Sequence, residues 1–350
     1  MKAKTPTVLL ELRGSLRLDD YIVDLCWSPD ARQLVAAGGE GKLFLAQFDA
    51  DLRTREALAA REVGQHGLGT LAVAWQPRGD AFVSSGQDGR IVWWDGASGE
   101  MRVEQRPSRA WTTQLAFAAD GTLASAAGKQ VYLWQAGLEL AHEFAPLEAT
   151  VASLCWDKPG RDLAVAKNGG LAVYRVEPPR HTVRQYRWAA PCLVASFSPN
   201  GRYLATGTQD GSVHFWHLAS GKDSQMRGYP AKVDTLSWSS DGRWLASAAG
   251  DVLVLWDFGG KGPEGSRPLQ LAGHTDRIEC LAFQPGGPFL VSGGRDWRLS
   301  LWLPGKATTA IDAHLTDSEP SCLRWSADGR FVAVGERSGA LSIYELVRLP

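Results

Sequence analysis

Short apolar runs separated by tight turns follow one another along the whole chain. The clearest example is LVASFSPNGRYLATGTQDGSVHFWH (193–217), in which an apolar run ending in an aromatic residue precedes a polar turn, a small-residue run, a second turn and a run ending in tryptophan. Ser-Pro-Asn-Gly and Asp-Gly are turn formers, and between runs of strand-like alternation they indicate β-hairpins. No long pattern of helical period competes with these strands. The pattern therefore predicts an all-β protein.

The same design recurs along the chain. Each repeat supplies three antiparallel strands, a, b and c, and a less regular strand d before the next repeat. The aromatic residue that closes strand a, here called the marker aromatic, recurs at steps of 39 to 48 residues. The eight marker aromatics are Trp27, Trp75, Phe117, Trp156, Phe197, Trp238, Phe283 and Trp325. Four short strands in a repeat of about 40 residues are typical of a propeller blade, so the sequence predicts an eight-bladed β-propeller of four-stranded antiparallel blades.

Two kinds of dipeptide, Trp-Asp and Gly-His, indicate a family resemblance. Trp94-Asp95 and Trp256-Asp257 end strand c of their repeats, and Gly273-His274 precedes strand a of another. With these motifs in register, the chain resembles the WD40-repeat family from about Val8 to Leu346. The resemblance implies one propeller domain over residues 1–350.

The resemblance also implies a structural tetrad of His, Ser, Asp and Trp in two blades. Its members would satisfy one another's hydrogen bonds between blades, so we interpret them as architecture and not as a catalytic triad. They are His66, Ser84, Asp88 and Trp94 in one blade and His274, Ser292, Asp296 and Trp302 in the other.

Other repeats depart from this pattern. The fifth has Trp188 where the tetrad histidine would stand, and the sixth has Tyr229 there. The third and sixth have shorter b–c turns without the aspartate, and the fourth and eighth end strand c in Tyr174 and Tyr344. We expect these blades to depend on apolar packing and to be softer.

The last repeat lacks a strand, and the N-terminal segment supplies one that has no repeat of its own. The last repeat, about 320–346, ends with strand c, whereas the N-terminal run at about 7–14 has no blade of its own. We predict that this run completes the last blade and closes the ring, because closure removes an exposed strand edge. Two connections, 49–62 and 258–268, interrupt the rhythm. Either could be an accessory contact or a variable surface loop.

Charge and composition restrict the classes of function. Lys and Arg total 37 and Asp and Glu total 38, for a net charge of −1, which argues against nucleic-acid binding. No run of 18 apolar residues and no signal-peptide core is present, so we expect no membrane partner and a cytoplasmic location. Five widely spaced cysteines indicate buried thiols and not a disulfide framework.

No catalytic motif stands out. Residues 37–43 resemble a phosphate loop, but they lack its first glycine and the hydroxyl residue after Lys42, and they fall on a b–c turn. Neither G-x-S-x-G nor H-E-x-x-H occurs. We predict no enzyme activity, no cofactor and no metal. A zinc site assembled from several blades stays open, with Cys280 and Cys322 at matching positions of adjacent blades.

The candidate binding residues are those that a propeller does not need. The position six before each marker aromatic opens strand a at the face that carries the d–a and b–c loops, here called the mouth face. Trp, Tyr and Arg are enriched at binding hot spots because they bury much area with few rotatable bonds. The predicted partner-binding residues on this face are Tyr21, Trp111, Trp188, Tyr229, Lys232, Arg277, Trp297 and Glu319. The alternative is that the rings fold inward between blades.

A second candidate is the basic stretch 180–187, expected to be an outer strand whose charges protect a free edge or contact a partner. The function that these observations predict is a non-catalytic scaffold, a monomeric propeller within a complex, which binds a peptide or domain of another protein on the mouth face. The alternative is a propeller enzyme or a binder of a small ligand or metal in the central channel. That alternative needs convergent ionisable groups, and the mouth positions supply Lys232, Arg277 and Glu319.

Overall fold

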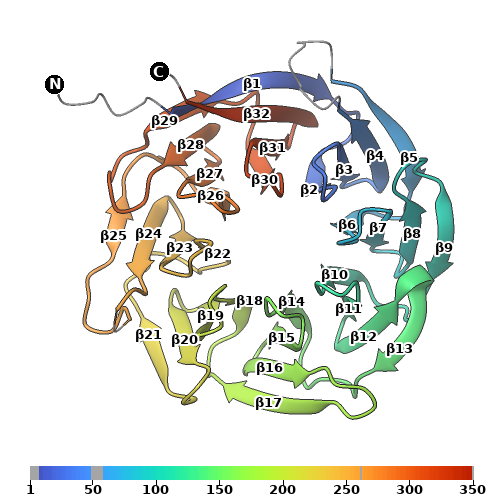
Figure 1. Cartoon of the computed structure of the whole chain (residues 1–350), viewed down its shortest axis with the longest axis horizontal. Helices are drawn as coiled ribbons and strands as arrows, with labels where there is room; N and C mark the ends of the chain where they lie inside the picture. The colour runs from blue at the N-terminus through green and yellow to red at the C-terminus, as the bar shows by residue number, and fades with distance from the viewer. Residues whose placement is uncertain (1–7, 49–57, 261, 349–350) are drawn as a thin grey trace.

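Eight four-stranded antiparallel sheets form a ring in the computed structural model, which describes residues 8–48, 58–260 and 262–348 (Figure 1). Seven sheets follow the chain in the order a, b, c, d, and the eighth combines the two ends of the chain. The prediction of an eight-bladed all-β propeller is therefore confirmed. The single helix within the described ranges is the 3₁₀ turn η1 (Ala136–Leu138), and none of the described helical residues could span a bilayer.

Blades 1 to 4 follow one another from the N-terminal side. Blade 1 consists of β2 (Ile22–Trp27), β3 (Gln33–Gly38), β4 (Lys42–Gln47) and β5 (Ala60–Gln65). Blade 2 consists of β6 (Thr70–Trp75), β7 (Ala81–Gly86), β8 (Ile91–Asp95) and β9 (Met101–Gln105). Blade 3 consists of β10 (Thr112–Phe117), β11 (Leu123–Ala127), β12 (Gln130–Gln135) and β13 (Glu139–Glu143). Blade 4 consists of β14 (Val151–Trp156), β15 (Asp162–Lys167), β16 (Gly170–Arg175) and β17 (Thr182–Arg187).

Blades 5 to 8 complete the ring. Blade 5 consists of β18 (Cys192–Phe197), β19 (Tyr203–Thr208), β20 (Val213–His217) and β21 (Asp223–Met226). Blade 6 consists of β22 (Thr235–Trp238), β23 (Trp244–Ala249), β24 (Val252–Asp257) and β25 (Leu269–Leu271). Blade 7 consists of β26 (Ile278–Phe283), β27 (Leu290–Gly294), β28 (Arg298–Trp302) and β29 (Asp312–Leu315). Blade 8 consists of β30 (Pro320–Trp325), β31 (Phe331–Glu336), β32 (Ala340–Arg348) and β1 (Val8–Arg17).

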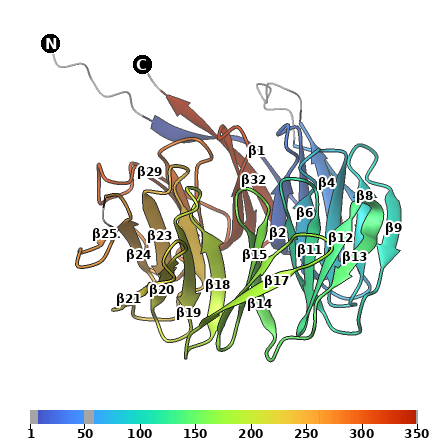
Figure 2. The same ribbon diagram turned by 60° about the horizontal axis from the view of Figure 1, so that its bottom comes forward.

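The N-terminal strand closes the ring as predicted. β1 pairs antiparallel with β32 from Val8 opposite Arg348 to Arg17 opposite Ala340, with a register shift between Leu12 and Gly14. The two strands run side by side in both ribbon views (Figure 2). One blade therefore contains the first and the last of the described strands, and the pairing of β1 with β32 acts as a latch.

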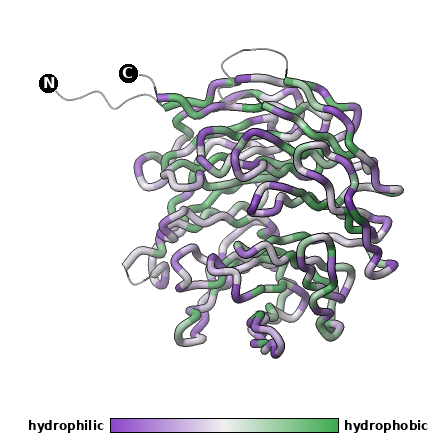
Figure 3. Tube along the Cα trace, turned by 45° about the vertical axis from the view of Figure 1, so that its right-hand side comes forward, coloured by the Kyte–Doolittle hydropathy of each residue, from purple (hydrophilic) through white to green (hydrophobic). Residues whose placement is uncertain are grey.

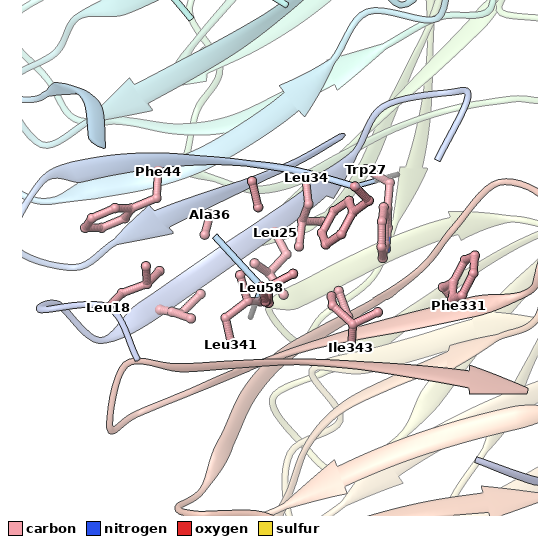
Figure 4. Close-up of a cluster of buried hydrophobic side chains, with 14 of the residues drawn as sticks. Leu18, Leu25, Trp27, Leu34, Ala36, Phe44, Leu58, Phe331, Leu341 and Ile343 are labelled. Atoms are coloured by element: carbon pink, nitrogen blue, oxygen red, sulfur yellow. The ribbon is translucent and has the colours of Figure 1, made fainter. Parts of the chain in front are cut away.

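Apolar side chains fill the spaces between neighbouring blades. Strands a lie nearest the centre of the ring and strands d lie outermost (Figure 1). Hydrophobic residues recur along the strands, whereas many loops are hydrophilic (Figure 3). The interface between blades 1 and 8 is an example: it contains Leu25, Leu34 and Trp27 of blade 1, packed with Phe331 and Ile343 of blade 8 (Figure 4). The core is thus divided into layers, one between each pair of blades.

Marker tryptophans also link adjacent blades through hydrogen bonds. The indole Nε1 of Trp27 donates to the carbonyl of Arg324 in the preceding blade, at 3.0 Å. Trp156 donates in the same way to Ala116, and Trp325 to Ala282, each at 3.0 Å. These three tryptophans therefore satisfy their own polar atom and a carbonyl of the neighbouring blade, whereas Trp75 donates to Gly79 in its own blade.

The two tetrads form continuous hydrogen-bonded chains. In blade 2, His66 Nδ1 lies 3.0 Å from Asp88 Oδ1, His66 Nε2 lies 2.9 Å from Ser84 Oγ, and Trp94 Nε1 donates to the same Oγ at 2.8 Å. Burial lowers the pKa of His66 below its ordinary value. The equivalent distances in blade 7 are 3.0, 2.7 and 2.8 Å, and burial lowers the pKa of His274 as well.

The two long connections and the basic stretch singled out in the sequence occupy different places in the structure. Of the connection 49–62, residues 49–57 lie outside the described residues, and residues 60–62 belong to β5. The connection 258–268 contacts blade 5, where Glu264 Oε1 lies 2.7 Å from His217 Nε2. The basic stretch 180–187 contains β17, the outer strand of blade 4, in which Tyr186 is buried and its neighbours along the strand are exposed. The described parts of all three segments lie in outer strands or loops.

Candidate functional site

The start of strand a and the b–c turn of the same blade lie side by side on the mouth face. The Gly39 amide donates to the Tyr21 carbonyl at 2.9 Å in blade 1, and the Arg295 amide donates to the Arg277 carbonyl at 2.8 Å in blade 7. In blade 8 the Arg337 amide donates to Glu319 at 3.0 Å. The position six before the marker aromatic is therefore held against a tight turn, which fixes the direction of its side chain.

Three of the predicted aromatic residues present large exposed rings. Trp111 is 54% exposed, Trp297 is 50% exposed and Tyr21 is 47% exposed. The Tyr21 ring lies across Gly39, where any side chain would collide with it. These residues come from blades 3, 7 and 1, so the exposed rings are distributed around the mouth face.

Trp297 stands at a position where the backbone favours glycine. Its φ is +61°, in the left-handed region, whereas the corresponding b–c turns use Gly89 with φ +76° and Gly211 with φ +72°. A bulky residue in this region costs about 1–2 kcal/mol. The Trp297 amide still closes the turn onto the Gly294 carbonyl at 3.1 Å. The fold therefore tolerates backbone strain to place an exposed indole at this turn.

Trp188 is less exposed than these three rings. Its ring stacks on His214 of blade 5 at 3.8 Å between centroids, and its Nε1 is buried without a hydrogen-bond partner among the described residues. It occupies the place of the tetrad histidine of blade 5 and packs as part of the blade, with one edge reaching a pocket beside blade 4.

Tyr229 has a structural position. Its hydroxyl lies 2.5 Å from Ser247 Oγ and accepts a hydrogen bond from Trp256 Nε1 at 2.7 Å. Burial raises the pKa of Tyr229 to about 12. The phenol thus joins serine and tryptophan as histidine does in blades 2 and 7, and we leave Tyr229 out of the binding surface.

The charged members of the predicted set belong to one network on blades 6, 7 and 8. Asp234 lies 3.0 Å from Lys232 Nζ and 2.7 Å from Arg277 Nη2. Glu279 pairs with Arg295 and lies 3.6 Å from Arg277, while Glu319 pairs with Arg337 at 2.9 Å. We call this group the ionic arc; its members are Lys232, Asp234, Arg277, Glu279, Arg295, Glu319 and Arg337. The charges nearly neutralise one another, so the arc offers directional polar contacts more than a strong net field.

Two exposed apolar residues near the mouth face were missed by sequence reasoning. Leu68 lies between Gly67 and Gly69 in the loop before blade 2, and Leu315 ends β29 just before Thr316, whose amide bonds to Trp297. Leu68 could have been identified as an apolar residue inside a turn. The exposure of Leu315 depends on how far strand d extends, which its short sequence does not indicate.

One ion pair joins the innermost strands of blades 8 and 1 near the centre of the ring. Arg324 Nη2 of blade 8 lies 2.7 Å from Asp24 Oδ1 of blade 1, and Asp24 Oδ2 accepts the Val73 amide of blade 2 at 3.2 Å. The Asp24 carboxylate raises the pKa of Arg324 further. This pair joins three blades and gives the centre a structural cross-link.

The cysteines offer little reactivity. All five are free, and burial raises the pKa of Cys26 to about 11 and those of Cys155 and Cys322 to about 12. Protonated thiols are poor nucleophiles and poor metal ligands. Within residues 8–48, 58–260 and 262–348, no group of three or more His, Cys, Asp or Glu side chains could hold a metal ion. Cys280 and Cys322 therefore lack the further ligands that a zinc site needs.

Comparisons with known proteins agree with this geometry. The family model described as "WD domain, G-beta repeat" matches just over half of the chain, at residues 61–95, 188–217, 222–257, 265–302 and 305–345. Residues 96–187, which contain all of blades 3 and 4, are outside these matches.

Similar proteins include two plant relatives. The chain is 24% identical over 242 residues to the "B-type cell cycle switch protein ccs52A" of Medicago truncatula, covering 66% of this chain and 50% of the relative. It is 27% identical over 229 residues to "Cell division cycle 20.1, cofactor of APC complex" of Arabidopsis thaliana, covering 62% and 50%. The chain thus spans about half the length of these curated relatives. The computationally designed Ika8 protein shares the fold, with a TM-score of 0.78, 19% identity and coverage of 96% and 99%.

Proposed function

Because the chain belongs to the WD40-repeat family, we propose that it is a non-catalytic scaffold whose mouth face binds a peptide or domain of another protein. One relative is described as a cofactor of a complex, and we carry over from it only the idea of action together with other proteins. Residues 1–350 then act as one propeller domain, monomeric within a complex. Free buried thiols favour a reducing compartment such as the cytoplasm.

The observation that carries this proposal is Trp297. A glycine would fit its turn without strain, yet the chain has a large ring there that is half-exposed. Residues with strained backbone conformations are concentrated at functional sites, where function offsets their cost. Trp111 and Tyr21 give the same face further exposed rings, and tryptophan and tyrosine dominate binding hot spots.

The ionic arc supplies the second part of the proposed surface. Lys232, Arg277 and Glu319 are only partly exposed and are held by salt bridges, so a partner would meet preorganised charges. Preorganised polar groups cost less entropy on binding than free side chains do. We therefore expect a partner segment with apolar or aromatic side chains for the exposed rings and polar groups for the arc.

The test is the substitution Trp297→Gly. It removes the ring and relieves the left-handed strain, so the free energy of unfolding should rise by about 1 kcal/mol while the affinity for the natural partner falls by about 30-fold. Affinity purification with mass spectrometry identifies proteins retained by the wild type and lost from the variant. Isothermal titration calorimetry with the purified partner then measures the loss.

The matched control is Met101→Gly, which removes a side chain of similar exposure from the outer strand of blade 2. It should leave partner binding unchanged. Loss of stability in Trp297→Gly in parallel with loss of binding would show that the ring is part of the core, and retention of every partner by the variant would refute the proposed surface.

A further inference from the structure

Blade 4 buries a lysine at the place of a tetrad. Lys167 is the last residue of strand b, β15, and is only 5% exposed. No hydrogen bond or ion pair joins its ammonium to another described side chain, and the side chain lines a pocket that opens to solvent. Most of the lysine stem is therefore buried, while the charged end is left for water or a ligand in the pocket.

The loss of the tetrad creates the space that Lys167 occupies. Gly86 is the equivalent residue in blade 2, and a side chain there would collide with His66 and Asp88. Blade 4 has Leu147 where His66 would stand and Tyr174 in place of the tetrad tryptophan. A long side chain can therefore enter the interface between blades 3 and 4 without meeting a polar partner.

Lys167 lines a pocket with a volume of about 880 Å³, a size typical of small-ligand sites. The pocket lies between the loop that follows blade 3 and the outer strand β17. Its apolar lining includes Leu147, Val183 and Tyr174, and Gln185 and Arg187 of β17 add polar groups. One carboxylate, that of Glu148, also lines the pocket, beyond ion-pair distance from Lys167. The pocket thus combines the ammonium of a largely buried lysine, the exposed cation of Arg187 and apolar walls.

From this arrangement we propose that the pocket of blade 4 binds a carboxylate group carried on an apolar stem, with the carboxylate at the Lys167 ammonium. The carboxylate supplies the missing counter-charge, and the stem covers Leu147, Val183 and Tyr174. Hydrogen bonds between charged groups are the strong ones, particularly where water is excluded. An acidic side chain flanked by apolar residues in a peptide and a free apolar carboxylic acid share this chemistry.

The experiment uses the full chain, two pairs of probes and one pair of proteins. Sodium hexanoate is compared with hexanol, the peptide acetyl-Leu-Glu-Leu-amide with acetyl-Leu-Gln-Leu-amide, and the wild type with Lys167→Met. Binding is measured by calorimetry and by the tryptophan side-chain ¹⁵N–¹H spectrum, in which Trp188→Phe identifies the Trp188 signal. We expect an acidic probe to bind the wild type and shift Trp188, whereas its neutral counterpart does not.

Lys167→Met keeps the length of the side chain and removes its charge, so the affinity for the acidic probe should fall about 10- to 100-fold. Lys306→Met, at an exposed lysine in the c–d connection of blade 7, is the matched control and should bind as the wild type does. If Lys167→Met does not fold, Glu148→Gln removes the competing carboxylate and should tighten binding instead. Failure of both acidic probes to bind the wild type, or equal affinity in Lys167→Met, would overturn the proposal.

This site is independent of the mouth-face proposal. Trp297→Gly should leave hexanoate and peptide binding in blade 4 unchanged, and Lys167→Met should leave the partner bound at the mouth face. The two proposals can therefore fail separately.

Discussion

Blades 4 and 8 have Tyr174 and Tyr344 in strand c at the place of the tetrad tryptophan, and each has an ionisable residue at the end of strand b. These residues are Lys167 in blade 4 and Glu336 in blade 8, and they are 5% and 1% exposed. Both replace the glycine that a complete tetrad requires. Glu336 accepts a hydrogen bond from the Ser318 amide at 2.6 Å and lies 3.3 Å from the Ser318 hydroxyl, whereas Lys167 finds no such partner among the described residues.

The difference arises in the loop that precedes each blade. The loop before blade 8 contains Ser318, a donor within reach of the buried carboxylate. The loop before blade 4 contributes Pro146 and Leu147, whose side chains cannot accept a hydrogen bond, and Glu148, which forms no ion pair with Lys167. Losing the same tetrad thus produces a closed polar contact in blade 8 and an open pocket lined by a lysine in blade 4.

The largest expected loss of stability follows from the different connectivity of blades 4 and 8. Blade 4 is one continuous segment, but blade 8 depends on β1. Deleting residues 1–17 removes the buried Leu10 and leaves the whole edge of β32 unpaired. We expect aggregation and a thermal midpoint lower than that of any single substitution described here, measured by size-exclusion chromatography and calorimetry.

A variant lacking residues 1–7 keeps all of β1 and is the matched control for this deletion. A monomeric elution profile with unchanged melting in the longer deletion would show that the latch does not stabilise the ring.

The second largest loss of stability is expected from a substitution that makes a blade with a tetrad resemble blade 4. Ser292→Val in blade 7 leaves the Nε2 of His274 and the Nε1 of the fully buried Trp302 without their shared partner. Each of the two unpaired buried groups costs about 1–3 kcal/mol, so the free energy of unfolding should fall by about 2–6 kcal/mol. Urea denaturation with an unchanged m-value measures this loss.

Ser292→Thr is the control because threonine has nearly the shape of valine and keeps the hydroxyl. It should lose clearly less stability than Ser292→Val. Equal losses would attribute the effect to overpacking at this position and not to the hydrogen bonds.

The architecture could be predicted because its signals are local and repeated. Turn residues and the marker aromatics, from Trp27 to Trp325, fix the number of blades, and the missing strand d of the last repeat indicates the latch. The mouth-face position of Tyr21, Trp111 and Trp297 follows from strand counting alone. These features depend on residues close together in sequence or on exact repetition.

The chemistry of single positions could not be predicted in the same way. Lys167 has the sequence context of a polar residue leaving a strand, and its burial depends on a loop that contributes no partner. The role of Tyr229 depends on Ser247 and Trp256, which lie 18 and 27 residues away. Trp188 differs from the exposed Trp111 because His214 stands beneath its ring. Such contacts are set by side chains brought together only in the folded ring.

The smallest expected effect is the pH dependence of stability that arises from the buried Glu336, which contacts Ser318 in blade 8. Burial raises the pKa of Glu336 above its ordinary value of 4.5, so the folded state disfavours the ionised form. The carboxylate therefore costs stability as the pH rises from 4.5 through the raised pKa, whereas glutamine does not titrate. Glu336→Gln keeps an acceptor for Ser318 and should be more stable than the wild type by about 1 kcal/mol at pH 7. Below pH 4.5, where Glu336 is protonated in both states, the advantage should disappear, as measured by urea denaturation from pH 4 to pH 8.

Glu100→Gln, at an exposed side chain of blade 2, should show no such dependence. A Glu336→Gln variant less stable than the wild type at pH 7 would mean that Ser318 more than offsets the cost of burial, and that the two tetrad-free blades differ even more than their geometry indicates.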